Sequence, residues 1–144
     1  MNTVEREGCG DLMRFLLMIW IVFIFIGTCT QDVHAFLSYG EVSFRLSKEP
    51  DWQNIAVLYP LEQVSVFELA GHFIMFFVLT LLLAMVLGRV GWIILISLMI
   101  AITTEFLQGY VGRGADLYDL LANVMGILIA VGLVYGVRFL GQLS

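Results

Sequence analysis

Charged residues and prolines are scarce in this 144-residue sequence: 13% of its residues are Asp, Glu, Lys or Arg, and two are proline. Soluble domains are about a quarter charged, and disordered chains combine low hydrophobicity with high charge, so this composition excludes both classes. The chain is instead 60% hydrophobic, with a mean hydropathy of +0.96. One membrane-spanning helix needs about 20 apolar residues. We therefore predict an all-α membrane protein with four transmembrane helices and no room for a separate catalytic domain.

The sequence also lacks a basic cluster and a disulfide framework. Without a run of Lys and Arg, it has no electrostatic footprint for nucleic acid or for an anionic membrane surface. The two cysteines, Cys9 and Cys29, flank the first apolar stretch and so cannot pair across a membrane. Acidic residues before that stretch favour an uncleaved first helix over a signal peptide.

Four apolar stretches predict the spans, at about residues 13–28, 69–87, 92–107 and 117–139. Inside a bilayer, backbone polar groups must be satisfied within their own segment, so each stretch is predicted to be a helix. The glycines around Arg89 predict a tight turn and an antiparallel hairpin between the second and third spans. Residues 30–67 form a long connection, for which we expect a partly ordered surface loop; the alternative is a dedicated recognition element. We interpret residues 1–144 as a single membrane domain.

Basic residues beside the spans indicate the orientation of the chain. Their distribution favours an integral protein of the bacterial cytoplasmic membrane with both termini in the cytoplasm and the long loop outside. The basic residues then on the cytoplasmic side are Arg6, Arg14, Arg89 and Arg138. Those then outside, spread over much more loop, are Arg45, Lys48 and Arg113.

Polar residues gather at three predicted helix ends: the start of the second span, the end of the third and the start of the fourth. Connectivity places these three ends on one side of the membrane, whichever way the chain is inserted. Small and polar faces turn toward other helices, so the layer is predicted to line a shallow cavity open to water. The residues predicted to contact a ligand there are His72, Glu105, Gln108, Arg113, Asp116, Asp119 and Asn123. The glycines predicted to pack against neighbouring helices are Gly126, Gly132 and Gly136.

Most of these residues have an ordinary structural alternative. Asp116 can be the N-cap of the fourth helix, Asn123 an interhelical hydrogen bond, and His72 a partner of Glu68. Glu105 is the hardest to explain in this way, because a carboxyl group one turn inside an apolar span is costly unless it is paired. Its candidate partners are Arg113 and His72.

The polar layer could support two kinds of chemistry. Arg113, between two glycines before a helix, is a plausible clamp for a phosphate or carboxylate group. The nearby carboxylates would repel an anion unless Arg113 or a bridging divalent cation offset their charge; the spacing predicts no dedicated metal site. A histidine and a carboxylate could also act as general acid and base, which makes His72, Glu105 and Asp119 the catalytic candidates.

The pattern T-E-x-x-Q followed by G-R-x-x-D-x-x-D-x-x-x-N-x-x-G, which begins at Thr104, resembles the VanZ-like family. The resemblance covers about residues 68–136. The family is named for a protein that lowers sensitivity to teicoplanin, so the resemblance implies a small multi-span protein of the cell envelope, associated with antibiotic resistance, whose polar motif faces outward. Two positions depart from the family pattern: Leu69 stands where a lysine is common, and Phe76 where a tyrosine is common.

Three functions follow as hypotheses. The first is a pocket that binds the head group of a polar lipid or cell-wall precursor. The second is a hydrolase or transferase acting on a lipid-linked phosphate or glycan in the same pocket. The third is a structural subunit of a larger membrane complex, with the motif locking helices together. The expected partners are the lipid bilayer, a lipid-linked or phosphate-bearing small molecule, and a second copy or other subunits, but no nucleic acid.

Overall fold

A computed structural model describes the backbone of residues 3–141 and most of their side chains, those of residues 3–7, 9 and 34 excepted. Predictions about the side chains of Arg6 and Cys9 therefore lie outside the described residues. Cys29 is a buried free thiol at the end of the first helix.

The described residues form helices and connections without a strand. The elements, in chain order, are α1 (Thr3–Cys29), α2 (Val33–Tyr39), the short 3-10 helix η1 (Leu61–Gln63), α3 (Val66–Val86), α4 (Val90–Tyr110) and α5 (Leu117–Leu140). Four segments are long and apolar enough to cross a membrane: Gly10–Cys29, Val66–Val86, Val90–Tyr110 and Leu117–Leu140. The predicted all-α class and the four spans are confirmed. The second and third spans start two to three residues earlier than predicted.

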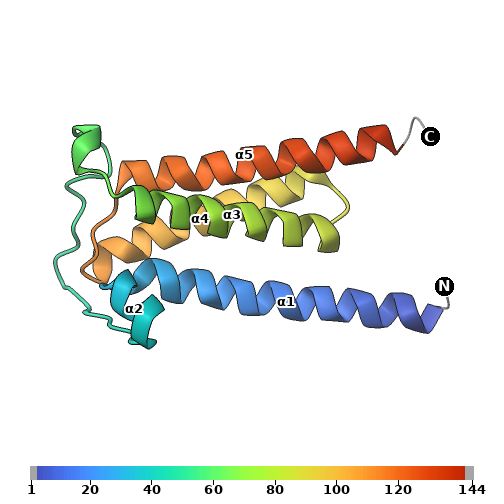
Figure 1. The fold of residues 1–144 in the computed structure, drawn as a ribbon, viewed down its shortest axis with the longest axis horizontal. Helices are drawn as coiled ribbons and strands as arrows, with labels where there is room; N and C mark the ends of the chain where they lie inside the picture. The colour runs from blue at the N-terminus through green and yellow to red at the C-terminus, as the bar shows by residue number, and fades with distance from the viewer. Residues whose placement is uncertain (1–2, 142–144) are drawn as a thin grey trace.

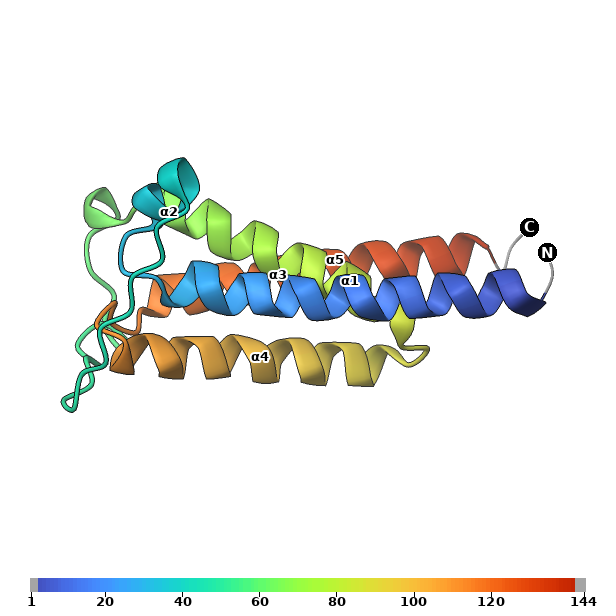
Figure 2. The same cartoon turned by 90° about the horizontal axis from the view of Figure 1, so that it is seen from below.

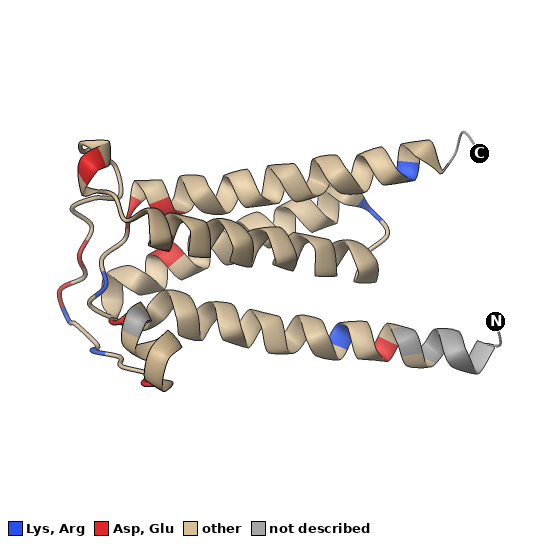
Figure 3. Cartoon of the chain, viewed as in Figure 1, with Lys and Arg blue, Asp and Glu red and all other residues tan. Residues whose placement is uncertain are grey.

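The four long helices run side by side, with both chain termini at one end of the bundle and the long connection at the other (Figures 1 and 2). α3 and α4 each contact the other three long helices, and α3 packs most extensively against α5. Most acidic residues lie at the end that carries the long connection, and the middle of the bundle is almost free of charged residues (Figure 3). This distribution matches an apolar band within a bilayer, with a polar layer at one of its surfaces.

The apolar core lies between α1, α3, α4 and α5. Its buried side chains are Ile24, Phe76, Leu79, Leu83, Ile93, Ala101 and Ile127. Phe76, where the family pattern commonly has tyrosine, is completely buried in this core. A hydroxyl at that position would need a partner among apolar side chains, so phenylalanine suits the site.

The connection between α1 and α3 is not one uninterrupted loop, because it contains α2 and η1. Asp32 caps α2 by accepting a hydrogen bond from the Ala35 amide, at 2.8 Å. Between α2 and η1 the chain lies across the end of α4: the Ser47 amide donates to Tyr110 O at 2.7 Å, and the Asp51 amide donates to Gly109 O at 2.9 Å. We call residues 41–60 the strap.

The strap is also held by a tryptophan and by the start of α5. The Trp52 ring lies so close to Gly109 that a Cβ added there would be 2.9 Å from it. The Ala115 amide donates to Asp51 O at 3.1 Å, and Leu117 donates to Asn54 O at 3.2 Å. The strap, which has no regular periodicity, is therefore held in place by backbone hydrogen bonds to the end of α4, to the α4–α5 loop and to the start of α5.

Gly126 lets α5 approach α3 closely. A Cβ added at Gly126 would collide with Phe73 O and lie 3.0 Å from Phe77 N, both on the backbone of α3. Nothing in the described structure lies within 4 Å of a Cβ added at Gly132 or Gly136, so their predicted packing against neighbouring helices stays a prediction. Both face outward, where the four helices of one chain have no further neighbour.

We expect Gly126→Ala to lower the free energy of unfolding by about 1–3 kcal/mol, because a methyl group there forces the α3 and α5 backbones apart. Gly132→Ala is the matched control and should be neutral or stabilising by up to about 1 kcal/mol, since alanine favours helix and has open space. Unfolding in mixed micelles with increasing SDS measures both. Equal effects of the two substitutions would contradict the close approach.

Candidate functional site

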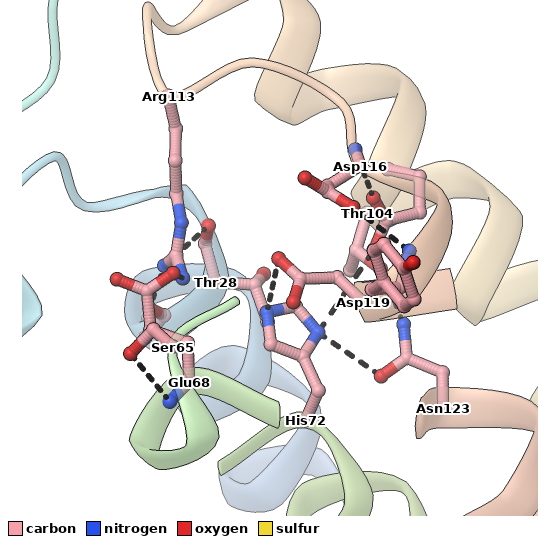
Figure 4. A network of polar contacts seen from close by, with 12 residues as sticks. Thr28, Ser65, Glu68, His72, Thr104, Arg113, Asp116, Asp119 and Asn123 are labelled. Atoms are coloured by element: carbon pink, nitrogen blue, oxygen red, sulfur yellow. Dashed lines mark hydrogen bonds and ion pairs between the residues drawn. The ribbon is translucent and has the colours of Figure 1, made fainter. Parts of the chain in front are cut away.

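Three helices bring buried polar side chains together below the strap. His72 comes from the second turn of α3, Glu105 from near the end of α4, and Asp119 and Asn123 from the first two turns of α5 (Figure 4). His72 is 1% exposed, Glu105 2%, Asn123 0% and Asp119 7%. The convergence of these four side chains was predicted from the sequence. Their depth was not, because a shallow open cavity was expected.

Asn123 joins the histidine to the glutamate. Its Oδ1 lies 3.1 Å from His72 Nδ1, and its Nδ2 donates to Glu105 Oε1 at 3.2 Å. Since the amide nitrogen faces the carboxylate, the amide oxygen faces the ring, and His72 Nδ1 must carry the proton of that hydrogen bond. Glu105 Oε1 also lies 3.9 Å from the same ring nitrogen. The three groups thus form one hydrogen-bonded chain across three helices.

The other ring nitrogen of His72 faces Asp119. Nε2 lies 3.3 Å from Asp119 Oδ2 without the alignment of a hydrogen bond. With a proton on Nδ1, Nε2 of a neutral ring is an acceptor, and so is an ionised carboxylate. Two facing acceptors repel, so a further proton, on the ring or on the carboxyl group, would make this contact favourable. The arrangement is that of an acid–base pair, the chemistry for which the sequence made these residues candidates.

Asp116 has a structural role at the start of α5. It caps α5, with Oδ1 accepting from the Tyr118 amide at 2.8 Å, while its own amide donates to Glu105 Oε2 at 3.3 Å. Its second carboxylate oxygen accepts the Tyr59 hydroxyl at 2.6 Å. That hydrogen bond raises the pKa of Tyr59 well above its usual range. The predicted N-cap is confirmed.

Tyr59 was missed by the sequence analysis. It lies at the end of the strap, where its ring packs edge-on against Tyr118, and the Tyr118 hydroxyl donates to Tyr59 O at 2.6 Å. No local signal marks this residue, because its contacts are with residues almost 60 positions later in a segment without periodicity.

Arg113 lies in the α4–α5 loop between Gly112 and Gly114, whose φ values of 78° and 82° require glycine. Its Nη1 donates to Gly27 O at 3.2 Å and to Thr28 O at 3.1 Å. These carbonyls end α1 and have no helical donor, so the guanidinium caps the negative end of that helix.

The second terminal nitrogen of the Arg113 guanidinium contacts a carboxylate. Nη2 lies 3.4 Å from Glu68 Oε2; the Arg113 side chain is 9% exposed and that of Glu68 41%. Glu68 therefore pairs with Arg113 and not with His72, which corrects one sequence expectation. Arg113 in turn has Glu68 as its ion-pair partner among the described residues and not Glu105, which corrects another. Figure 4 shows Arg113, Glu68 and Thr28 to one side of His72.

Gln108 lies one turn beyond Glu105 but does not join the network. It is completely buried, and neither its amide nitrogen nor its amide oxygen has a hydrogen-bond partner in the described part of the chain. A buried amide without partners destabilises a fold. The predicted contact of Gln108 with a ligand stays a prediction.

A polar cavity of about 240 Å³ lies between the strap and the helix ends. We call it the polar chamber. It is bordered by Asp51 and Asn54 of the strap, by Arg113 and Glu68, and by Asp116 and Asp119 at the start of α5. Within the part of the chain that the structure describes, no group of three or more His, Cys, Asp or Glu side chains could hold a metal ion. The chamber is therefore a place for a polar group beside one guanidinium and several carboxylates.

Asn123→Leu should lower the free energy of unfolding by about 1–3 kcal/mol, because His72 and Glu105 would each lose a buried hydrogen-bond partner. Gln108→Leu is the contrasting variant. It removes a buried amide that bonds to nothing in the described chain, so stability should stay the same or rise. SDS-induced unfolding compares the two. A larger loss for Gln108→Leu than for Asn123→Leu would contradict the network as described.

Known proteins are similar to this chain over most of its length. The VanZ/LLP1 family model matches residues 13–140, which includes the first span and the strap as well as the region 68–136 that carries the motif. A curated relative, described as the uncharacterized membrane protein YwnJ of Bacillus subtilis (strain 168), is 31% identical over 132 residues; the alignment covers 90% of this chain and 91% of the relative. No solved structure matches the chain. The chain is an integral membrane protein and belongs to the VanZ/LLP1 family.

Proposed function

We propose that the polar chamber binds the phosphate-bearing head group of a lipid or cell-wall precursor at the membrane surface. The observation that carries the proposal is the position of Arg113, which borders the chamber and has Nη2 beside the partly exposed carboxylate of Glu68. A guanidinium is well suited to phosphate because its donors match the geometry of two phosphate oxygens. The hypotheses of a hydrolase or transferase and of a structural subunit stay predictions.

The carboxylates around the chamber differ in how strongly they oppose an anion. Asp116 accepts hydrogen bonds from Tyr59 and from the Tyr118 amide, so both of its oxygens are occupied. Asp119 Oδ2 lies 3.3 Å from His72 Nε2, so a proton on either group would lower the net negative charge of the pair. Glu68 is the carboxylate that competes directly for Arg113. Because its side chain is 41% exposed, it can turn to water and leave the guanidinium to a phosphate group.

The chamber is proposed to face the outside of a bacterial cytoplasmic membrane. Both chain termini lie at the opposite end of the bundle from the chamber (Figure 1). The bias of basic residues favours a cytoplasmic location for those termini. With this orientation, the chamber meets head groups of the outer leaflet and lipid-linked molecules of the cell envelope.

Arg113→Gln should lower the affinity for dioleoyl phosphatidic acid by about tenfold or more, since a hydrogen bond to a charged group contributes about 1.5–3 kcal/mol. Arg138→Gln is the matched control, because Arg138 also donates to backbone carbonyls at a helix end, those of Gly88 and Ala84, but lies at the other end of the bundle. Native mass spectrometry of the purified protein with this lipid, and with dioleoylglycerol as the phosphate-free probe, measures the affinities.

A variant that gains affinity tests the same idea, because a misfolded protein would not bind the lipid more tightly. Glu68→Gln removes the carboxylate that competes for Arg113 and should raise the affinity for dioleoyl phosphatidic acid several-fold, while binding of dioleoylglycerol stays the same. An unchanged affinity in both Arg113→Gln and Glu68→Gln would show that the chamber does not hold the phosphate.

The orientation can be tested with single cysteines in a Cys9→Ser, Cys29→Ser background. Lys48→Cys, in the exposed strap, should react with a membrane-impermeant maleimide on intact bacterial cells. Arg89→Cys, in the exposed turn between α3 and α4, should react only after the cells are permeabilised. The reverse pattern of labelling would place the chamber in the cytoplasm.

A further inference from the structure

A second cavity, mostly apolar, adjoins the site. It has a volume of about 290 Å³ and lies between α1, α2 and the first half of α3. We call it the apolar groove. Trp20 and Phe23 of α1, Phe36 of α2, and Met75 of α3 form much of its wall. Its other end is bordered by Glu68, His72 and Arg113. The groove is thus an apolar cavity beside membrane-spanning helices, and two charged residues on its border, Glu68 and Arg113, also border the polar chamber.

The groove is built by specific contacts. The Trp20 indole donates to Met75 O at 3.0 Å and so fixes α1 against α3. The ring of Phe23 lies 5.2 Å from that of Trp20 and 6.1 Å from that of Phe36, so a row of three aromatic rings joins α1 to α2. Rigid aromatic walls hold the space open beside α3.

Small residues make the room in the groove. Gly27 faces it from α1, where an added Cβ would lie 3.5 Å from Met75 Sδ. Gly71 faces it from α3, and nothing lies within 4 Å of a Cβ added there. Gly71 lies beside His72, at the end where the groove meets the charged residues.

Arg113 and Glu68 border both the apolar groove and the polar chamber. A phosphate group at Arg113 would therefore have a polar space on one side and an apolar space on the other. The geometry points to a single occupant for both: an amphipathic lipid whose phosphate lies at Arg113 and whose hydrocarbon chain lies in the groove. This inference rests on the proposed function and names its ligand class, a phosphate joined to a long acyl or polyprenyl chain.

The direction of access follows from this assignment. Because the groove lies between spanning helices, its occupant enters sideways from the bilayer. A water-soluble phosphate compound would have to enter the chamber past the strap instead. The chain adds little through the hydrophobic effect, since the bilayer is already apolar. The hydrocarbon chain contributes by fitting the aromatic wall of the groove, which fixes the phosphate next to Arg113.

Gly71→Leu tests the groove, because the added side chain would fill the space beside His72. We expect the affinity for dioleoyl phosphatidic acid, measured by native mass spectrometry, to fall about tenfold or more. Gly132→Leu is the matched control, a glycine in a spanning helix with the same open surroundings but remote from the groove, and should leave the affinity unchanged. Ala70→Phe, at a second position that borders the groove, should act like Gly71→Leu.

Glycerol 3-phosphate, which has the head group without the chain, separates this inference from the proposed function. It should bind far more weakly than dioleoyl phosphatidic acid and with the same affinity in wild type and Gly71→Leu. If Arg113→Gln weakens binding of the lipid but Gly71→Leu and Ala70→Phe do not, the head-group site stands and the groove does not hold the chain. If dioleoyl phosphatidic acid binds no better than dioleoylglycerol, both proposals fail.

Discussion

The Asn123 amide is the contact on which the polar end of the bundle depends. One side chain accepts from the His72 ring and donates to Glu105, and it thereby links α3, α4 and α5. An amide can do this because it carries a donor and an acceptor at a fixed spacing, which neither a carboxylate nor a hydroxyl provides in the same way. Each of the three groups would be costly to bury alone. Together they make a buried polar layer compatible with an apolar span.

The remaining long helix, α1, joins this layer through Arg113. The guanidinium lies against the last carbonyls of α1, and the loop that carries it follows α4 directly. The loop also receives the strap, so the long connection, α1 and the start of α5 all meet around one side chain. The two glycines beside Arg113 are needed because the chain turns there with positive φ, close to Gln31 and Asp51. A displacement of this loop would change the polar chamber and the end of the apolar groove together.

Hydrophobic runs and helix ends explain which parts of the structure could be predicted from sequence. The four spans, the Asp116 cap and the convergence of His72, Glu105, Asp119 and Asn123 all follow from local pattern and connectivity. The strap does not, because Trp52 and Tyr59 act through contacts with residues more than 50 positions later in the chain. The partners of Arg113 were also out of reach: composition shows which charges are present, but only packing decides that α1 carbonyls and Glu68 lie nearest. Gly132 and Gly136 differ again: the sequence shows a packing motif, but it does not show that the motif lies on a face with no neighbour in the described chain.

The two arginines at opposite ends of the bundle have different surroundings. Arg113 and Arg138 each donate to carbonyl groups at the end of a helix. Arg138 has no carboxylate within ion-pair distance among the described residues, and its donors are directed at Gly88 and Ala84 alone. Arg113 keeps one nitrogen beside an exposed carboxylate and borders a polar cavity. An ion pair with an exposed member contributes little to stability, so Glu68 is poorly explained as a structural residue. Under the proposed function, it is the group that occupies the guanidinium until an anionic lipid replaces it.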